Sequence, residues 1–116
     1  IAASWAEVIG ATSLVVGAVE EDSSGYPDCT VEFYKKFSAA ISEGTRPSTT
    51  LSIDTPVITM NKAEIVKRGL ELEVPMHMSW SCYVGQEEAC GKCESCMLRL
   101  RGFAAAGVVD QIPYAK

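Results

Sequence analysis

The chain has 116 residues, of which 47% are hydrophobic and 22% charged, and its formal net charge is −5 at pH 7. That length makes one small domain or part of a larger one, with a composition typical of globular proteins. The negative charge argues against broad binding to nucleic acids or anionic membranes, and no apolar run approaches the roughly 20 residues that span a bilayer. No secretory or transit segment is visible, so we expect a cytoplasmic protein.

The first elements predict an α/β domain. Apolar residues at helical spacing indicate a helix over residues 1–9, ended by Gly10. The chain starts without Met in what reads as the middle of this helix, so we expect a longer protein with a segment upstream of Ile1. The apolar run 14–18 is typical of a strand buried on both faces of a parallel sheet. A helix followed by such a strand is typical of α/β folds.

A polar loop with four carboxylates follows this strand, over residues 19–30. Ligands of open parallel sheets bind beyond the carboxyl ends of the strands, where this loop would emerge. Tyr26 and Asp28 are therefore candidate binding residues. The acidic run 20–22 could equally be a solvated connection, Asp28 a helix cap, and Cys29 a small buried hydrophobic residue.

The middle of the chain predicts a helix over residues 31–42, a strand over residues 51–53 and a second helix that begins at Asn61. Asn61 is a suitable N-cap, and Glu64 can complete a capping box. Lys62 would occupy the first helical position, where a cation opposes the helix dipole. An anionic phosphate bound there would offset that cost, and simple solvation of Lys62 is the alternative.

Four of the five cysteines have the spacing C-x7-C-x2-C-x2-C. A C-x2-C turn lets two thiolates converge on one ion, and Cys90, Cys93 and Cys96 overlap two such turns. Cys82 can return from a short loop as the fourth ligand. Four thiolates with no open position describe a tetrahedral structural zinc site.

Disulfides, an iron–sulfur cluster and unpaired buried thiols are the alternatives to zinc. Disulfides suit small secreted proteins, whereas this chain has an odd cysteine count and enough apolar residues for a core. An iron–sulfur cluster also takes four cysteines, so the ligand count leaves it open. Trp80, two residues before Cys82, could shield the metal or stack on a ring. A last helix is predicted from Glu94 to a stop at Gly107, followed by an apolar tail.

Taken together, the chain resembles the C-terminal half of the 7-cyano-7-deazaguanine synthases, ligases of queuosine biosynthesis. The resemblance covers essentially the whole chain. It is carried by residues 2–6, 24–29 (Ser-Gly-Tyr-Pro-Asp-Cys), 62–66 and 80–83, the cysteine cluster, Arg99, Pro113 and Tyr114.

The resemblance implies the C-terminal part of a Rossmann-like ATP pyrophosphatase, a fold also described as PP-loop or adenine nucleotide alpha hydrolase-like. This part would contain a parallel sheet, a four-cysteine zinc segment and a C-terminal helix. The division would be an ATP pyrophosphatase part over residues 1–76 and a zinc segment with helix and tail over residues 77–116. The family's substrates are 7-carboxy-7-deazaguanine, ammonia and ATP with Mg²⁺, and its product is 7-cyano-7-deazaguanine (preQ0). The family also implies a homodimer, and the net charge predicts that the protein binds neither membranes nor nucleic acid directly.

The resemblance assigns roles to the candidate residues. Asp28 would accept the adjacent N–H donors of the guanine-like ring, with Tyr26 or Trp80 stacking on it, and Lys62 would contact phosphate. The four cysteines would hold zinc. The family's ATP loop, Ser-Gly-Gly-x-Asp-Ser, does not occur in this sequence, so we expect it upstream of Ile1. A stand-alone zinc module that binds a partner, and a PP-loop relative that modifies tRNA, are the alternative functions.

Overall fold

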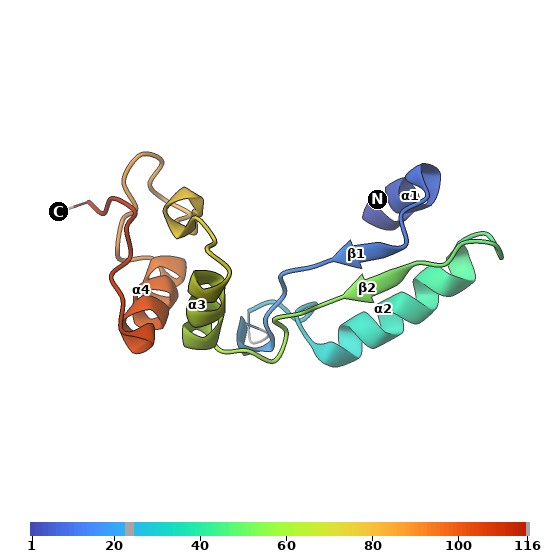
Figure 1. Cartoon of the computed structure of the whole chain (residues 1–116), viewed down its shortest axis with the longest axis horizontal. Coiled ribbons are helices and arrows are strands. Elements are labelled where there is room, and N and C mark those ends of the chain that lie inside the picture. Colours follow the sequence, from blue (N-terminus) through green and yellow to red (C-terminus); the bar gives the residue numbers. More distant parts are fainter. Residues whose placement is uncertain (23–24, 116) are drawn as a thin grey trace. The chain divides into compact units, whose positions relative to one another are not determined.

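The structure is a computed structural model that describes residues 1–22 and 25–115. The chain forms two compact units, Ile1–Met60 and Asn61–Lys116 (Figure 1). Helices and a parallel pair of strands confirm the predicted α/β class. The expected division after residue 76 stays a prediction. Ser24, one of the residues that carry the family resemblance, lies outside the described residues.

The first unit contains, in chain order, α1 (Ala2–Ile9), β1 (Ser13–Val15), η1 (Glu20–Asp22), α2 (Val31–Gly44) and β2 (Ser52–Asp54). As predicted, α1 ends at Gly10, whose φ of 70° lies in the left-handed region that glycine adopts readily. At the start of α2 the hydroxyl of Thr30 accepts a hydrogen bond from the Phe33 amide. Thr30, not Asp28, is therefore the N-cap of α2.

The sheet of this unit is a parallel pair, with Leu14 of β1 opposite Ile53 of β2. Both predicted strands are present, but β1 is shorter than the apolar run 14–18. Val15 is 73% exposed, so the prediction of a strand buried on both faces is wrong. Burial on both faces requires elements packed above and below the sheet, and among the described residues none covers the Val15 side chain. Burial begins just beyond β1, at Ala18 and Val19.

A single carboxylate connects α1 to the loop between α2 and β2. Glu7 Oε1 accepts hydrogen bonds from the Arg46 amide at 2.8 Å and the Thr49 hydroxyl at 2.7 Å. These two donors, the Arg46 amide first, lower the pKa of Glu7 below its ordinary value. The loop between α2 and β2 is therefore held at both of these residues.

The second unit contains α3 (Lys62–Glu71), η2 (Met76–Met78) and α4 (Glu94–Ala106). The predicted capping box is confirmed: Asn61 Oδ1 accepts from the Glu64 amide at 3.0 Å, and the Glu64 carboxylate accepts from the Asn61 amide at 2.8 Å. Helices α3 and α4 pack side by side (Figure 1). As predicted, α4 ends at Gly107, with φ of 78°.

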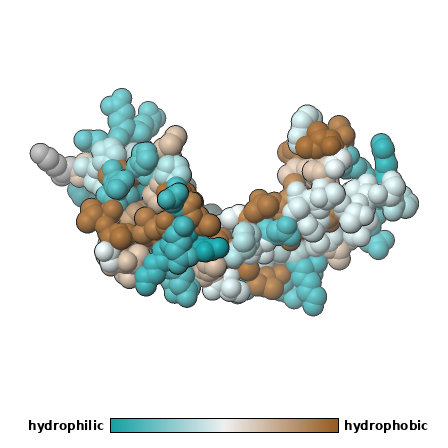
Figure 2. Space-filling model, in the orientation of Figure 1, coloured by the Kyte–Doolittle hydropathy of each residue, from teal (hydrophilic) through white to brown (hydrophobic). Residues whose placement is uncertain are grey.

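Hydrophobic side chains remain on the surface in both units (Figure 2). On α1, Trp5 is 65% and Val8 77% exposed, whereas Ala6 is the buried residue of this helix. In the second unit, Val66 of α3 and Phe103 of α4 are buried. Among the described residues, no helix is both long enough and apolar enough to cross a membrane.

Candidate metal centre

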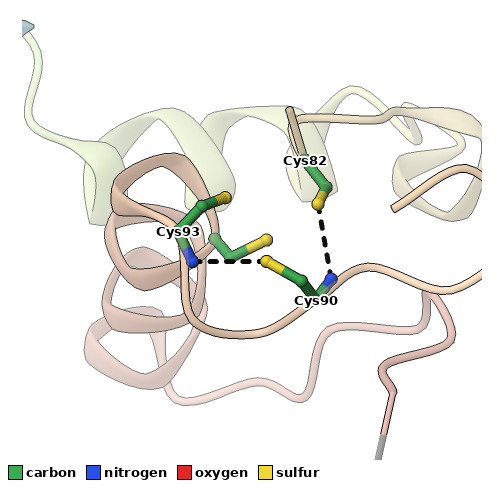
Figure 3. Close-up of side chains that lie close together, drawn as sticks. Cys82, Cys90 and Cys93 are labelled. Carbon is green, nitrogen blue, oxygen red and sulfur yellow. Dashed lines mark hydrogen bonds between the residues drawn. The ribbon is translucent and has the colours of Figure 1, made fainter. Parts of the chain in front are cut away.

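The second unit brings four cysteines to one point. The sulfurs of Cys82, Cys90, Cys93 and Cys96 all lie within 4.8 Å of one another, and Figure 3 shows the first three converging. Zinc–sulfur bonds of about 2.3 Å place tetrahedral ligands roughly 3.8 Å apart, so shifts of about an ångström would complete such a site. The donor set and its spacing therefore fit a single tetrahedral ion, as the sequence predicts.

The cysteines of the cluster come from a loop, a glycine turn and the start of a helix. Cys82 lies in the loop that follows η2, and Cys96 lies in the first turn of α4. Between them, Gly91 has φ of 68°, a left-handed conformation that turns the chain from Cys90 toward Cys93. Glycine suits this position, because a residue with a Cβ atom would be strained in this conformation.

Backbone amides donate hydrogen bonds to the cysteine sulfurs. Cys82 Sγ accepts from the amides of Gly85 at 3.1 Å, Val84 at 3.3 Å and Cys90 at 3.3 Å. Cys90 Sγ accepts from the Cys93 amide at 3.3 Å (Figure 3). Such donors favour the negatively charged thiolate, the form that binds metals.

The surroundings shift the pKa values of these thiols in opposite directions. The amide of Cys90, followed by that of Gly85, lowers the pKa of Cys82 to about 6. Backbone donors, that of Tyr83 first, also lower the pKa of Cys93. Burial instead raises the pKa of Cys96 to about 12. A cation bound by all four sulfurs would therefore displace the Cys96 proton, the usual coupling of metal binding to proton release.

Apolar residues surround the cluster. Cys82 and Cys96 form a buried core with Ala89 and Ile112, against which Tyr114 packs. Residue 89 immediately precedes Cys90, whereas residues 112 and 114 belong to the tail that follows α4. The apolar tail predicted after the last helix thus packs against the cysteine cluster.

A buried ion pair adjoins the same cluster. Arg99 Nε donates to Asp110 Oδ2 at 2.5 Å, Arg99 Nη2 donates to Asp110 Oδ1 at 2.9 Å, and the Tyr114 hydroxyl donates to Asp110 Oδ2 at 2.7 Å. The Arg99 side chain is 9% exposed and that of Asp110 1%. Burial opposes ionisation of Asp110, but the bonds from Arg99 and Tyr114 outweigh it and lower the pKa of this carboxyl.

Sequence reasoning missed Asp110. Arg99 and Tyr114 entered only through the family resemblance, without a partner. A signal was present, because Asp110 is the single charged residue between Gly107 and Lys116, in an otherwise uncharged, largely apolar stretch. A lone carboxylate in a segment that packs into a core requires a buried donor.

The other candidate residues do not join the cysteines as ligands. The Trp80 indole donates to the Cys82 carbonyl at 3.1 Å and is 42% exposed, so it lies beside the first cysteine of the cluster. Lys62 begins α3 as predicted and lies against Gly102 of α4. Tyr26 and Asp28 are exposed residues of the first unit, in the segment between η1 and α2. The substrate and phosphate roles of these four residues stay predictions.

Comparisons with known proteins agree with the resemblance seen in the sequence. The family described as "Queuosine biosynthesis protein QueC" matches residues 1–107. The 7-cyano-7-deazaguanine synthase of Chlorobaculum parvum is 58% identical over 114 residues, which are 98% of this chain and 50% of that protein. The proteins of the same name from Chlorobaculum tepidum and Acidobacterium capsulatum are 57% and 56% identical, again over 98% of this chain.

The chain spans about half the length of the curated relatives that it matches. The matched region contains all four clustered cysteines and most of the second unit. The chain belongs to the QueC family of queuosine biosynthesis proteins.

Proposed function

We propose that this chain is the substrate- and zinc-binding part of an ATP-dependent ligase that converts 7-carboxy-7-deazaguanine and ammonia to 7-cyano-7-deazaguanine. The observation that carries this proposal is the family match over residues 1–107, together with relatives named for that product. The phosphate-binding motif of the implied reaction is absent from these 116 residues, and we propose that it lies in a longer chain.

The reaction begins with activation of a poor electrophile. The substrate carboxylate attacks ATP to form an acyl-adenylate and release pyrophosphate, and ammonia then displaces AMP to give an amide. Dehydration of the amide yields the nitrile. The ATP-dependent steps require Mg²⁺ and cationic groups to offset the phosphate charge, and we propose Lys62 for a contact with phosphate or the acyl-adenylate.

Substrate recognition is proposed for the loop before α2. The guanine-like ring presents two neighbouring N–H donors, and a carboxylate such as that of Asp28 can accept both. Asp28 is exposed, as a group that meets a ligand must be. Stacking on the ring is proposed for Tyr26 or Trp80, which are 50% and 42% exposed.

For the cysteine cluster we propose a single zinc ion with a structural role. Four thiolates leave no coordination position for substrate, as in closed structural zinc sites. All five cysteines are free, in keeping with a thiol-reducing cytoplasm, which we propose as the location of the protein. The close spacing of the four sulfurs favours one ion over a multi-iron cluster, whose several metal atoms spread their ligands further apart.

The test uses the full-length protein that contains this chain, incubated with 7-carboxy-7-deazaguanine, ATP, Mg²⁺ and isotopically labelled ammonia. The expected product is the nitrile with the label in its nitrile nitrogen, together with pyrophosphate, as measured by mass spectrometry. Asp28→Asn should weaken substrate binding at least ten-fold in calorimetry. Glu43→Gln, which removes an exposed carboxylate of α2, is the matched control and should bind like the parent.

Two results would overturn the proposal. If the zinc-loaded full-length protein neither bound the deazaguanine acid nor formed the nitrile, but incorporated the label into tRNA, the chain would belong to a tRNA-modifying relative. If it bound ATP in no condition, a zinc module without catalysis would be the better description. Unchanged substrate affinity in Asp28→Asn would remove that residue from recognition while leaving the reaction intact.

A further inference from the structure

The tail after α4 forms a short strand-like contact with the loop that carries the cysteines. The Ala89 amide donates to the Pro113 carbonyl at 2.8 Å, and the Ala115 amide donates to the Ala89 carbonyl at 2.9 Å. These bonds form an isolated parallel bridge between Ala89 and Tyr114. Ala89 is fully buried beneath this contact, and the next residue in the chain is the ligand Cys90.

The tail also covers the turn between two ligands. A Cβ atom placed on Gly91 would lie 3.6 Å from the Tyr114 ring, in ordinary van der Waals contact. Ile112 is 5% exposed and belongs to the same buried core as Cys82 and Cys96. The tail therefore contributes apolar cover to the two buried cysteines, Cys82 and Cys96, whereas Cys90 and Cys93 are half-buried.

One guanidinium connects the tail to the polypeptide on the other side of the cluster. Besides Asp110, Arg99 Nη1 donates to the Ser79 hydroxyl at 2.9 Å, and Nη2 donates to the Met76 carbonyl at 3.2 Å. The segment 76–81 leads directly to Cys82. Arg99 itself lies one helical turn after Cys96 in α4. The buried Arg99 side chain thus links the segment before the first ligand, the helix of the last ligand and the tail.

We propose that Arg99, Asp110 and Tyr114 form a clasp that holds the C-terminal tail over the cysteine cluster and thereby sets the rate of zinc release. The three side chains are positioning residues, because none of them contributes a ligand atom to the cluster. Residues outside the ligand set commonly tune metal affinity by fixing the orientation of the ligands and the access of solvent.

The chemistry of the clasp makes it sensitive to small changes. A planar guanidinium meets a carboxylate with two parallel bonds, and lysine cannot reproduce that geometry. Breaking a buried pair leaves an uncompensated charge, so one altered partner favours the open tail. Removing only the Tyr114 hydroxyl leaves the ion pair in place and is the mildest of the possible changes.

The inference concerns metal retention and stands whether or not the ligase proposal is correct. The experiment uses the full-length zinc-loaded protein, whose zinc content is first measured by elemental analysis. Zinc release to an excess of chromogenic chelator is then followed for the parent, Arg99→Lys, Asp110→Asn and Tyr114→Phe. We expect release to accelerate about ten-fold in Tyr114→Phe and up to about 100-fold in the other two.

Amide hydrogen exchange separates opening of the tail from general unfolding. The amides of Ala89 and Ala115 should lose protection in the variants in proportion to zinc release, whereas amides of α2 in the first unit keep theirs. Arg101→Lys, an exposed position of α4, and Tyr34→Phe in α2 are the matched controls and should release zinc at the parent rate.

The proposal is overturned if Arg99→Lys and Tyr114→Phe release zinc at the parent rate. It is equally overturned if Arg101→Lys accelerates release as much as Arg99→Lys, or if faster release comes with loss of protection throughout α3 and α4. If Asp110→Asn fails to fold, Arg99→Lys and Tyr114→Phe still test the proposal. A parent protein that contains no zinc would refute the inference at its first step.

Discussion

Gly102 of α4 lies directly against Lys62, the first residue of α3. A Cβ atom built on Gly102 would come within 2.8 Å of Lys62 Cβ and 3.3 Å of its carbonyl carbon. Both are atoms close to the backbone, so neither can move aside independently of α3. The two helices that flank the cysteine cluster can therefore approach this closely only if position 102 has no side chain.

Gly102→Ala should destabilise the second unit even though alanine is the better helix former. Overpacking costs about 1–3 kcal/mol, and the gain in helix propensity returns about 1 kcal/mol, so we expect a net loss of about 1 kcal/mol. The measurement is the free energy of opening of α3 and α4 from amide hydrogen exchange.

Gly44→Ala is the control for this substitution. Gly44 ends α2 with open space around its Cα atom, so alanine there should be neutral or slightly stabilising. Equal stabilisation by both substitutions would contradict the close packing of α3 on α4.

Loss of one clustered cysteine should cost the metal. Cys96→Ser removes the most deeply buried cysteine of the cluster, which is 1% exposed, and we expect the purified full-length protein to contain almost no zinc. Because binding energy of a structural metal is also folding energy, amide protection in α4 should fall as well. Cys29→Ser is the matched control, since Cys29 is a free, half-buried thiol outside the cluster. A full zinc content in Cys96→Ser would exclude that residue as a ligand.

The convergence of the four cysteines was predictable because short-range rules determine it. Cys90, Cys93 and Cys96 are close in sequence, and a C-x2-C turn constrains two sulfurs whatever the rest of the fold does. The helix ends at Gly10 and Gly107 and the capping box at Asn61 followed from equally local chemistry.

Tertiary pairing was harder to predict. The burial of Val15 depends on how many strands and helices flank β1, and an apolar run alone cannot report that number. The partner of Asp110 is 11 residues away on α4, a separation at which no periodicity pairs two side chains. Asp28 and Thr30 are both residue types that cap helices well. Thr30 is the N-cap because α2 begins at Val31, directly after it.

The contribution of the Asn61 cap to the stability of α3 should be measurable. Asn61→Ala removes the acceptor for the Glu64 amide and half of the capping box, so we expect a loss of about 1 kcal/mol in the second unit. Asn61→Asp retains an acceptor at the same position and should stay within a few tenths of a kcal/mol of the parent. The readout is amide exchange in α3, and equal losses in both variants would show that the cap oxygen contributes nothing.

Glu7 should give the first unit a stability that depends on pH. Its pKa in the folded protein is lowered below 4.5, mainly by the Arg46 amide and then by the Thr49 hydroxyl. The unfolded chain therefore binds a proton more readily, so the stabilisation is complete above pH 4.5 and disappears as the pH falls through the folded-state value. Glu7→Gln should have a lower urea midpoint than the parent near pH 6, and the gap should close below pH 4.

The comparison can be made by following α1 signals in urea, because acid effects on the cysteine cluster are common to the parent and the variant and cancel in the difference. Glu43→Gln should show no such pH-dependent gap. If the difference between Glu7→Gln and the parent were the same at pH 6 and at pH 3.5, the carboxylate charge would not be what holds the loop at Arg46 and Thr49. The destabilisation in Glu7→Gln would then come from the changed side chain and not from loss of its charge.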